Sequence, residues 1–316
     1  MNDLSIPSSW VEARACVPLG WHELVAEALA IGPCTTVAIG AHSVATAPPD
    51  DGYEYVRTFF RSSADGPDLR AKVQSALDQL AERAQVPELK GLSVDFLVLP
   101  AEDYATSWRK SWRPFRLRRG GRELALLPSW DPHADRYRPG TDLRLLIEPG
   151  GSFGSGRHAT TRTCLGVLLE RIRGGERVLD AGTGSGILAV VARLAGAEQC
   201  LGFDTDPLSQ VAASELARDN GADRTEFRTG TLACIENGEG PFDVLLANIY
   251  SDVIQANAAS LAQLLSTEGW FAFSGCPLQH LDGTRDAILA AGLQIDEERL
   301  RGRWATFVGQ HKQVRG

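Results

Sequence analysis

The chain has 316 residues, of which 43% are hydrophobic and 23% are charged. This length suits about two domains, and this composition excludes a largely disordered chain, a collagen and a coiled coil. There are 32 Lys and Arg residues against 40 Asp and Glu, for a net charge of −8. The acidic balance disfavours general binding of nucleic acid and favours a small ligand or a basic protein partner.

No apolar run approaches the roughly 20 residues that span a bilayer, and Met1–Trp10 carries no signal-peptide pattern. The cysteines are scattered without a CxxC pair, at Cys16, Cys34, Cys164, Cys200, Cys234 and Cys276. We interpret them as reduced core thiols, and we expect a cytoplasmic protein with no metal site and no membrane partner. The sequence does not indicate an oligomeric state.

Residues 1–100 alternate between strand and helix patterns. Strands are predicted at Trp10–Val17, Thr35–Ile39, Tyr53–Arg61 and Leu92–Leu99, and helices at Gly20–Ala30 and Asp68–Gln85. The resulting order β-α-β-β-α-β is typical of a ferredoxin-like α+β domain. Such a sheet often serves as a binding module, although the fold alone does not identify the ligand.

Residues 101–142 are expected to form a linker region between two domains. A short helix is predicted at Glu102–Trp112 and a strand at Glu123–Leu127. Seven basic residues lie among aromatic ones in Arg109–Arg122, which suggests either a phosphate-bearing partner or a solvated charged face. The acidic charge of the whole chain favours the solvated face, so no stable nucleic-acid partner is expected.

Residues 143–316 repeat a strand–loop–helix pattern. Strands are predicted at Arg177–Asp180, Cys200–Asp204, Thr225–Thr229, Asp243–Asn248, Trp270–Ser274, Leu293–Leu300 and Arg303–Val308. Helices are predicted at Ile187–Ala195, Pro207–Asn220, Asp252–Leu265 and Leu278–Ala291. This alternation indicates an α/β domain with a doubly wound parallel sheet, and the last two strands should form an antiparallel hairpin because no helix separates them.

The most informative segment is 180–186 (DAGTGSG), which follows an apolar strand and opens a helix. Glycine lets the backbone turn sharply and approach a ligand, and a helix N-terminus offers free N–H groups. The spacing differs from the GxGxxG of dinucleotide enzymes, and it resembles the first motif of class I S-adenosylmethionine-dependent methyltransferases. The resemblance implies a Rossmann-like fold in which Gly182 and Gly184 make room for the methionine part of the cofactor. A glycine-rich turn that binds nothing is the alternative.

Two polar residues end neighbouring strands near this loop. Asp204 closes the second strand of the domain, where a carboxylate can accept hydrogen bonds from both hydroxyls of a ribose. Asp206 is expected to cap the helix that starts at Pro207. Asn248 ends the fourth strand and is followed by Tyr250, so its amide can hold the amino-acid end of the cofactor or orient an incoming amine. Capping or turn roles are the alternatives for Asp204 and Asn248.

Upstream, residues 148–161 read EPGGSFGSGRHATT. Together with the glycine loop and Asn248, this segment resembles the PrmA family, whose pattern is Pro-Gly-x-x-Phe-Gly-Thr-Gly-x-His-Pro-Thr-Thr and whose members methylate large-subunit ribosomal protein eleven. Further stretches that resemble the family are Trp108, Trp112, Pro114 and Phe115, followed by Pro128-Ser129-Trp130.

The resemblance implies that Thr161, Gly182, Asp204 and Asn248 contact the cofactor, with His158 and Thr160 shaping the same loop. Helix capping is the alternative role for Thr160 and Thr161. The resemblance also implies that the ferredoxin-like domain captures the ribosomal protein. The sequence departs from the family at Ser155, Ala159, Tyr250, Cys276 and Pro277. We expect these departures to lie on the substrate side and to leave cofactor use intact.

Methyl transfer from a sulfonium requires a neutral nucleophile that is held in line, so the protein's main task is positioning. We expect no obligatory side-chain base: Asn248 and Tyr250 are candidates for orienting the amine, and His158 is a weak candidate base. The predicted function is N-methylation of lysine side chains or N-terminal amines of ribosomal protein eleven. The alternatives are a methyltransferase of the same fold with another protein or a small molecule as acceptor, and a binding protein without catalysis.

Overall fold

The computed structural model describes residues 9–29, 34–39, 53–61, 67–84, 86–100, 114–130, 142–147, 156, 158–236 and 238–312. These residues belong to two compact units, one within 9–100 and the other within 114–312. The predicted helix Glu102–Trp112, with both of its tryptophans, lies outside the described residues. None of the described helices is long and apolar enough to cross a membrane.

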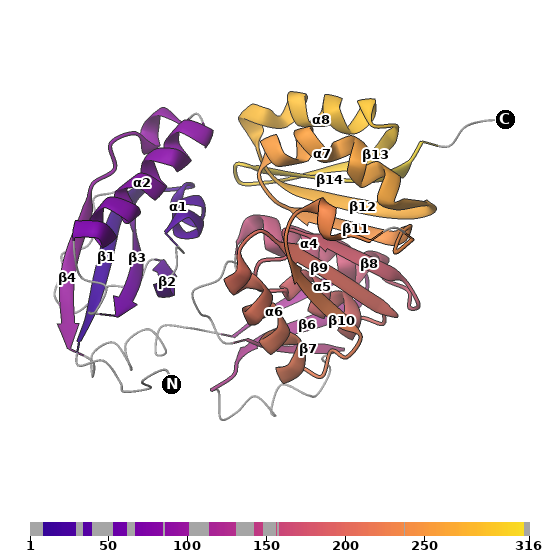
Figure 1. Ribbon diagram of the computed structural model, residues 1–316, viewed down its shortest axis with the longest axis horizontal. Helices are drawn as coiled ribbons and strands as arrows, with labels where there is room; N and C mark the ends of the chain where they lie inside the picture. Colours follow the sequence, from indigo (N-terminus) through magenta and orange to yellow (C-terminus); the bar gives the residue numbers. More distant parts are fainter. Residues whose placement is uncertain are drawn as a thin grey trace. The chain divides into compact units, whose positions relative to one another are not determined.

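The first unit contains a four-stranded antiparallel sheet with the strand order β2-β3-β1-β4 (Figure 1). Its strands are β1 (Ser9–Pro18), β2 (Cys34–Ile39), β3 (Tyr53–Arg61) and β4 (Val94–Pro100). Its helices are α1 (His22–Ala28), α2 (Pro67–Ala84) and the short 3-10 helix η2 (Pro87–Leu89). The helix α1 packs against three of the strands and against α2. The order β-α-β-β-α-β agrees with the order predicted from the sequence.

The two faces of β1 differ in polarity because successive side chains of a strand point to opposite faces. Val11 and Ala13 are buried on one face, whereas Glu12 and Arg14 are buried on the other. The Glu12 carboxylate lies 3.9 Å from the Arg57 guanidinium of β3. Burial raises the pKa of Glu12 and lowers the pKa of Arg57, and the attraction between the two groups opposes both shifts. Desolvation therefore works against the charged forms of this pair.

The second unit is built on a seven-stranded sheet with the order β10-β9-β8-β11-β12-β14-β13 (Figure 1). Neighbouring strands are parallel except along β14, which is antiparallel to both β12 and β13. The strands are β8 (Arg177–Ala181), β9 (Gln199–Asp204), β10 (Thr225–Thr229), β11 (Phe242–Asn248), β12 (Leu265–Pro277), β13 (Leu293–Arg301) and β14 (Trp304–His311). The predicted doubly wound sheet and its antiparallel hairpin are therefore confirmed.

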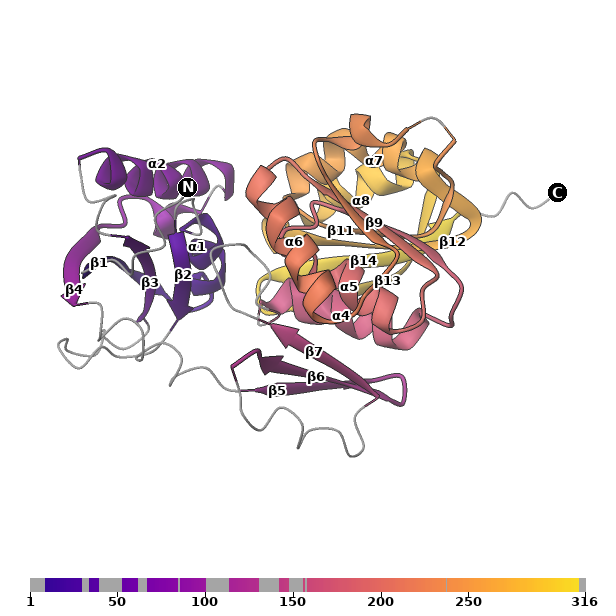
Figure 2. The same cartoon turned by 60° about the horizontal axis from the view of Figure 1, so that its bottom comes forward.

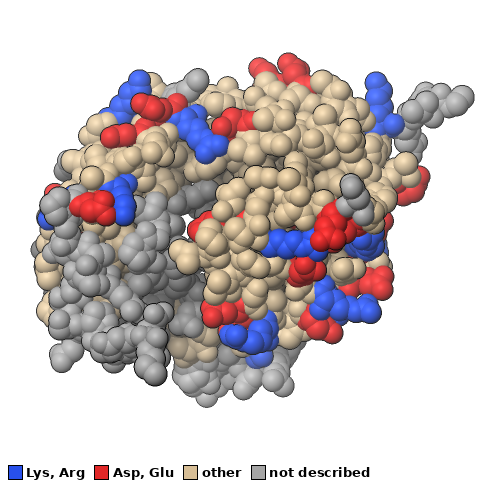
Figure 3. All heavy atoms as spheres, viewed as in Figure 1, with Lys and Arg blue, Asp and Glu red and all other residues tan. Residues whose placement is uncertain are grey.

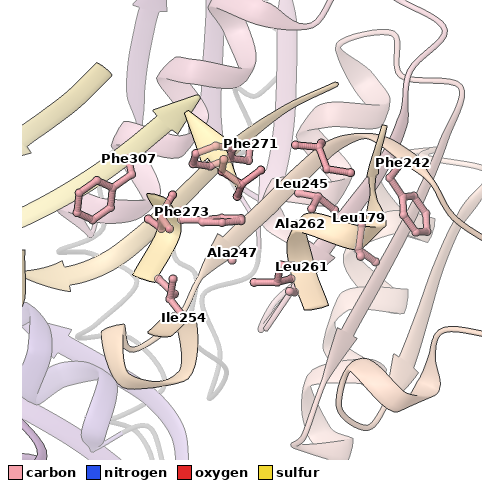
Figure 4. Packing of buried hydrophobic residues seen from close by; sticks show 14 of the residues in the cluster. Leu179, Phe242, Leu245, Ala247, Ile254, Leu261, Ala262, Phe271, Phe273 and Phe307 are labelled. Carbon is pink, nitrogen blue, oxygen red and sulfur yellow. The ribbon is translucent and has the colours of Figure 1, made fainter. Parts of the chain in front are cut away.

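Helices cover both faces of this sheet. They are α4 (Ala159–Arg171), α5 (Ile187–Leu194), α6 (Pro207–Asp219), α7 (Ser251–Leu264) and α8 (Leu281–Ala290), with 3-10 turns η4 (Leu232–Cys234) and η5 (Leu278–His280). Beneath α7 and α8, a core of aromatic and aliphatic side chains joins β11, β12 and β14 (Figure 4). Phe271 and Phe273 stack at 4.5 Å between ring centroids. The opposite face receives α4, which packs against β11, β12 and β14.

Part of the expected linker forms two strands, β5 and β6, which join β7 in a three-stranded sheet of the second unit, in the order β5-β6-β7 (Figure 2). Its strands are β5 (Phe115–Arg119), β6 (Arg122–Pro128) and β7 (Leu143–Ile147). A hairpin turn at Gly120-Gly121 joins β5 to β6, with both glycines at positive φ. Two glycines between alternating apolar and polar residues are a hairpin signal. The sequence therefore carries a local indication of this pairing, although we did not predict it.

Two predicted boundaries differ from the structure. The strand β12 starts at Leu265 rather than at Trp270. Leu265, the C-cap residue of α7, already has an extended backbone and pairs with Phe242. The predicted helix Leu278–Ala291 starts as the 3-10 turn η5, and α8 follows it at Leu281. Neither difference moves the carboxyl ends of β8, β9 or β11.

Candidate functional site

The glycine loop connects β8 to α5 at the carboxyl edge of the sheet. Gly182, Gly184 and Gly186 have φ values of 70°, 52° and 80°, a region that L side chains rarely adopt. The N–H groups of Gly182 and Thr183 both donate to the Phe203 carbonyl of β9, at 2.9 and 3.0 Å. A Cβ atom on Gly182 would lie 2.1 Å from the Ile249 Cγ2 atom. The loop therefore requires glycine for its own conformation and for its contact with the end of β11.

Asp204 lies directly beside this loop, at the end of β9. One carboxylate oxygen accepts the Gly184 N–H at 2.9 Å, and the other accepts the Asp206 N–H at 3.0 Å. The predicted cap is confirmed, because the Asp206 side chain accepts the Leu208 N–H at the start of α6. Asp204 is thus oriented by two backbone donors, one of which belongs to the glycine loop.

Asp180 is a buried acid beneath the loop, at 1% exposure. Its Oδ2 atom accepts a hydrogen bond from the Thr183 hydroxyl at 2.7 Å. Burial raises the pKa of Asp180 to about 7, although the Thr183 hydrogen bond acts in the opposite direction. This carboxyl therefore titrates near neutrality, unlike an ordinary aspartate.

Asn248 and Thr161 meet although 87 residues separate them in the chain. The Asn248 Nδ2 atom donates to Thr161 Oγ1 at 3.3 Å, and Thr161 is 1% exposed. The strand β12 supports this corner, since Ser274 is the register partner of Asn248 and its carbonyl accepts the Ile249 N–H at 3.2 Å. Two residues predicted to contact the same ligand therefore contact each other.

Neither Thr160 nor Thr161 is the N-cap residue of α4, so the alternative role considered for them is wrong. The N-cap is His158, whose Nδ1 atom accepts the Thr160 N–H at 3.2 Å and lies 2.5 Å from the Thr160 hydroxyl. The imidazole takes the place of the usual Ser, Thr, Asp or Asn cap. Thr161 consequently has no capping role, and Ala159 is the first residue of the helix.

The departures from the family pattern do not all face a substrate. Tyr250 is the residue before α7 and follows Asn248, the last residue of β11, by two positions. Cys276, in contrast, is fully buried, and its thiol contacts the Thr284 hydroxyl of α8 at 3.3 Å. The expectation that Cys276 lies on the substrate side is therefore wrong: after the bend at Gly275 its side chain enters the core beneath α7 and α8.

Most of the segment 148–157 lies outside the described residues, and Gly156 is the described member of its glycine pattern. At φ 75°, a Cβ atom on Gly156 would lie 2.4 Å from the Leu126 Cδ2 atom of β6. Gly156 therefore packs closely against the small sheet. Nearby, the Arg162 guanidinium of α4 lies over the Phe115 ring of β5, 5.3 Å from its centroid.

The basic residues of β5 and β6 are matched by acids or by helix ends. Arg116 and Arg118 both contact the buried Glu123 carboxylate. Arg122 donates to the carbonyls of Ile172 and Ala195, the C-cap residues of α4 and α5. One face of the molecule likewise shows basic and acidic side chains close together (Figure 3). For the described part of the basic run, 114–122, this pairing agrees with a solvated charged face rather than a phosphate-binding surface. Arg109, Lys110 and Arg113 lie outside the described residues.

The cysteines whose side chains are described are free, at Cys16, Cys164, Cys200, Cys234 and Cys276. Burial raises the pKa of the Cys164 and Cys200 thiols to about 12. These two thiols are therefore uncharged and unreactive at neutral pH. No group of His, Cys, Asp and Glu in the described part of the chain has the arrangement of a metal site.

Comparison with known proteins agrees with this architecture. A family model described as ribosomal protein L11 methyltransferase (PrmA) matches residues 10–312. The ribosomal protein L11 methyltransferase of Pelotomaculum thermopropionicum is 39% identical over 212 residues, which cover 67% of this chain and 66% of that protein. The protein of the same name from Streptococcus equi subsp. zooepidemicus is 31% identical over 254 residues, covering 80% and 77%.

A solved structure is also similar. The ribosomal protein L11 methylase of Lactobacillus delbrueckii subsp. bulgaricus has a TM-score of 0.55 and 30% identity, covering 64% of this chain and all of that one. The matched family model extends over both units, from β1 to the end of β14. The glycine loop, the acid at the end of β9 and the Asn248 corner thus occur within a match that covers nearly the whole chain. The chain belongs to the ribosomal protein L11 methyltransferase (PrmA) family, a family of S-adenosylmethionine-dependent methyltransferases.

Proposed function

We propose that this chain transfers methyl groups from S-adenosylmethionine to amino nitrogens of ribosomal protein L11, on lysine side chains, on the N-terminal amine, or on both. The observation that carries the proposal is the convergence of the glycine loop, Asp204 and the Thr161–Asn248 pair. They lie at the carboxyl ends of β8, β9 and β11, where doubly wound sheets bind their ligands.

The residues at this edge fit the cofactor in shape and polarity. Gly182 packs against Ile249 and the Gly184 N–H donates to Asp204, so the loop backbone lies at the carboxyl edge without side chains of its own at these positions. We assign these glycines to the methionine part of the cofactor. We assign Asp204 to the ribose, because each carboxylate oxygen keeps a lone pair for a hydroxyl after accepting a backbone N–H. When bound, the cofactor supplies an electrophilic methyl group on a sulfonium.

The orientation of the Asn248 amide suits a nucleophilic amine. Its Nδ2 atom donates to Thr161, so its carbonyl oxygen is directed to other donors, such as the cofactor's ammonium group or an acceptor amine. We propose that Asn248 and Tyr250 orient the amine for in-line attack, with Thr161 completing the cofactor contacts. In this scheme, positioning of the amine against the methyl group supplies most of the rate acceleration, and no side-chain base is required.

We further propose that different parts of the chain have different functions. Residues 1–100 form the ferredoxin-like domain that recognises the ribosomal protein. The small sheet β5-β6-β7 and the seven-stranded sheet belong to the methyltransferase part of the chain. A net charge of −8 favours a basic protein partner over a nucleic acid. Because the proposed substrate is a ribosomal protein, we also propose a cytoplasmic location.

Intact-mass spectrometry of ribosomal protein L11 tests this function. Unmethylated L11 incubated with the full-length chain and S-adenosylmethionine should gain mass in steps of one methylene group, and Asp204→Ala should reduce the gain strongly. If calorimetry shows cofactor binding but the mass of L11 stays unchanged, the acceptor is another protein or a small molecule. Tyr250, the family departure beside Asn248, would then be the first residue to substitute.

A further inference from the structure

The first strand residue of β14, Trp304, contacts the start of α4. Its ring meets the His158 ring edge-on, with 5.1 Å between the centroids and 67° between the planes. Trp304 is 4% exposed, and it pairs with Pro277 of β12 and with Arg301 of β13. Because a strand lies on each side of its backbone, the Trp304 ring is a rigid support for the imidazole.

His158 links the Trp304 ring to the start of α4, because it is the N-cap residue of this helix. Its Nδ1 atom must be unprotonated to accept the Thr160 N–H, so the cap fixes the plane of the ring. His158 also accepts the Arg162 N–H with its carbonyl, at 2.9 Å. An imidazole is longer than the usual capping side chains and reaches a partner that Asn or Ser would not reach.

The first turn of α4 carries Thr161, whose hydroxyl lies 3.3 Å from Asn248 Nδ2. This distance is at the long end for a hydrogen bond, so a small shift of the turn would break the contact. A chain of contacts thus runs from Trp304 through His158 and the Thr160 N–H to Thr161.

We propose that Trp304 is a positioning residue: its ring holds the His158 imidazole in the capping orientation and thereby sets Thr161 opposite Asn248. The inference rests on the proposed function, in which Thr161 and Asn248 contact the cofactor. None of the sequence motifs points to Trp304, which lies in the C-terminal hairpin.

The chain offers a matched control at the other end of the same helix. Trp270 of β12 lies beneath the Arg171 guanidinium, which is 5.8 Å from the ring centroid. Arg171 ends α4, far along the helix from Thr161. Replacing Trp270 therefore removes an aromatic contact to α4 without touching its first turn.

The test uses full-length variants and measures the Kd for S-adenosylmethionine by calorimetry. Trp304→Leu and His158→Ala should each raise this Kd by about fivefold to tenfold, the equivalent of losing one helix cap. Trp304→Phe keeps an aromatic edge contact and should stay within about twofold of the wild type. Trp270→Leu should also leave the Kd within about twofold.

A double variant separates positioning from general stability. His158→Asn keeps a capping side chain but is too short to contact Trp304. In this background Trp304→Leu should change the Kd by less than about twofold, because its effect passes through the imidazole. An equal loss of affinity in both backgrounds, or an equal loss in Trp270→Leu, would overturn the inference.

Hydrogen exchange gives a readout that does not depend on activity. Amides of the first turn of α4 should exchange faster in Trp304→Leu and His158→Ala, and at the wild-type rate in Trp270→Leu. Unchanged exchange in His158→Ala would contradict the proposed cap even if Trp304→Leu fails to fold. A wild-type chain that does not methylate L11 would contradict the proposed function and leave the exchange result standing.

Discussion

The Gly184 N–H donates to the Asp204 carboxylate at 2.9 Å, which joins the loop after β8 to the end of β9. The second carboxylate oxygen accepts the Asp206 N–H, so the side chain cannot rotate freely. A ligand that reaches Asp204 therefore also reaches the glycine loop. The glycine loop and Asp204, which the sequence indicates separately, therefore belong to one site.

Removing this carboxylate should weaken cofactor binding. Asp204→Ala eliminates the acceptor for the proposed ribose hydroxyls, and hydrogen bonds to a charged group contribute roughly 1.5–3 kcal/mol, so the Kd for S-adenosylmethionine should rise roughly 10–100-fold. Asp206→Asn is the control, because it keeps an acceptor for the Leu208 N–H and should leave the Kd within about twofold. Comparable losses in both variants, measured by calorimetry, would argue against a ribose contact at Asp204.

The first glycine of the loop should be intolerant of a side chain. Gly182→Ala places a methyl group at positive φ and against Ile249 Cγ2, which together should lower the free energy of unfolding by roughly 2–4 kcal/mol. Gly221→Ala is a matched control, since Gly221 has a similar φ of 64° and no atom within 4 Å of the added Cβ. It should lose only about 1 kcal/mol. Equal losses in urea unfolding would show that the Ile249 contact has no energetic role.

The periodic patterns of the second unit predicted its sheet well, because local sequence determines strand and helix periods. The strand Thr225–Thr229 begins and ends where it was predicted, and Asp206 caps α6 as expected. The middle strand of the small sheet was predicted at Glu123–Leu127 and is confirmed as β6. The flanking strands β5 and β7 were missed because they have five residues each and carry arginines at exposed or half-buried positions. Short strands with charged residues do not differ clearly from a linker when only periodicity is considered.

Part of the candidate site could be predicted from the positions of its residues on the strands, rather than from helix and strand periods. Each signal sits at the carboxyl end of a strand, so the fold rule brings Asp204 and Asn248 to one edge. The contacts of His158 with Trp304, and of Asn248 with Thr161, join residues far apart in the chain. No local pattern indicates such partners, and the placement of Cys276 in the core depends on the bend at Gly275.

The side chain of Asn220 acts as a partner for the edge of β7. It accepts the Leu146 N–H at 2.7 Å and donates to the Leu146 carbonyl at 2.7 Å. Asn220→Ala leaves both backbone groups without this partner and should lower the free energy of unfolding by roughly 2–3 kcal/mol. Asn257→Ala removes a side chain that donates to a carbonyl within its own helix, and it should lose less than about 1 kcal/mol. Faster exchange of the Leu146 amide in Asn220→Ala would confirm the mechanism, and equal losses would contradict it.

Asp180 should make stability depend on pH in an unusual direction. Its pKa in the folded chain is raised to about 7 by burial, whereas an unfolded aspartate ionises near pH ~3.9. Between these values the folded state binds more protons than the unfolded state, so this residue's contribution to the free energy of unfolding falls as pH rises from about 4 to about 7. Above pH ~7 both states are ionised and the contribution is constant.

The variant Asp180→Asn isolates this effect, because it removes the titrating group and keeps an acceptor for the Thr183 hydroxyl. The difference in unfolding free energy between pH 5 and pH 8 should be smaller in the variant than in the wild type, since one source of the decline is gone. Thr183→Val removes the hydrogen bond that lowers the pKa of Asp180, so its stability should keep falling to a higher pH. Urea titrations at several pH values measure these slopes, and identical slopes in wild type and Asp180→Asn would mean that the buried carboxyl is ionised throughout.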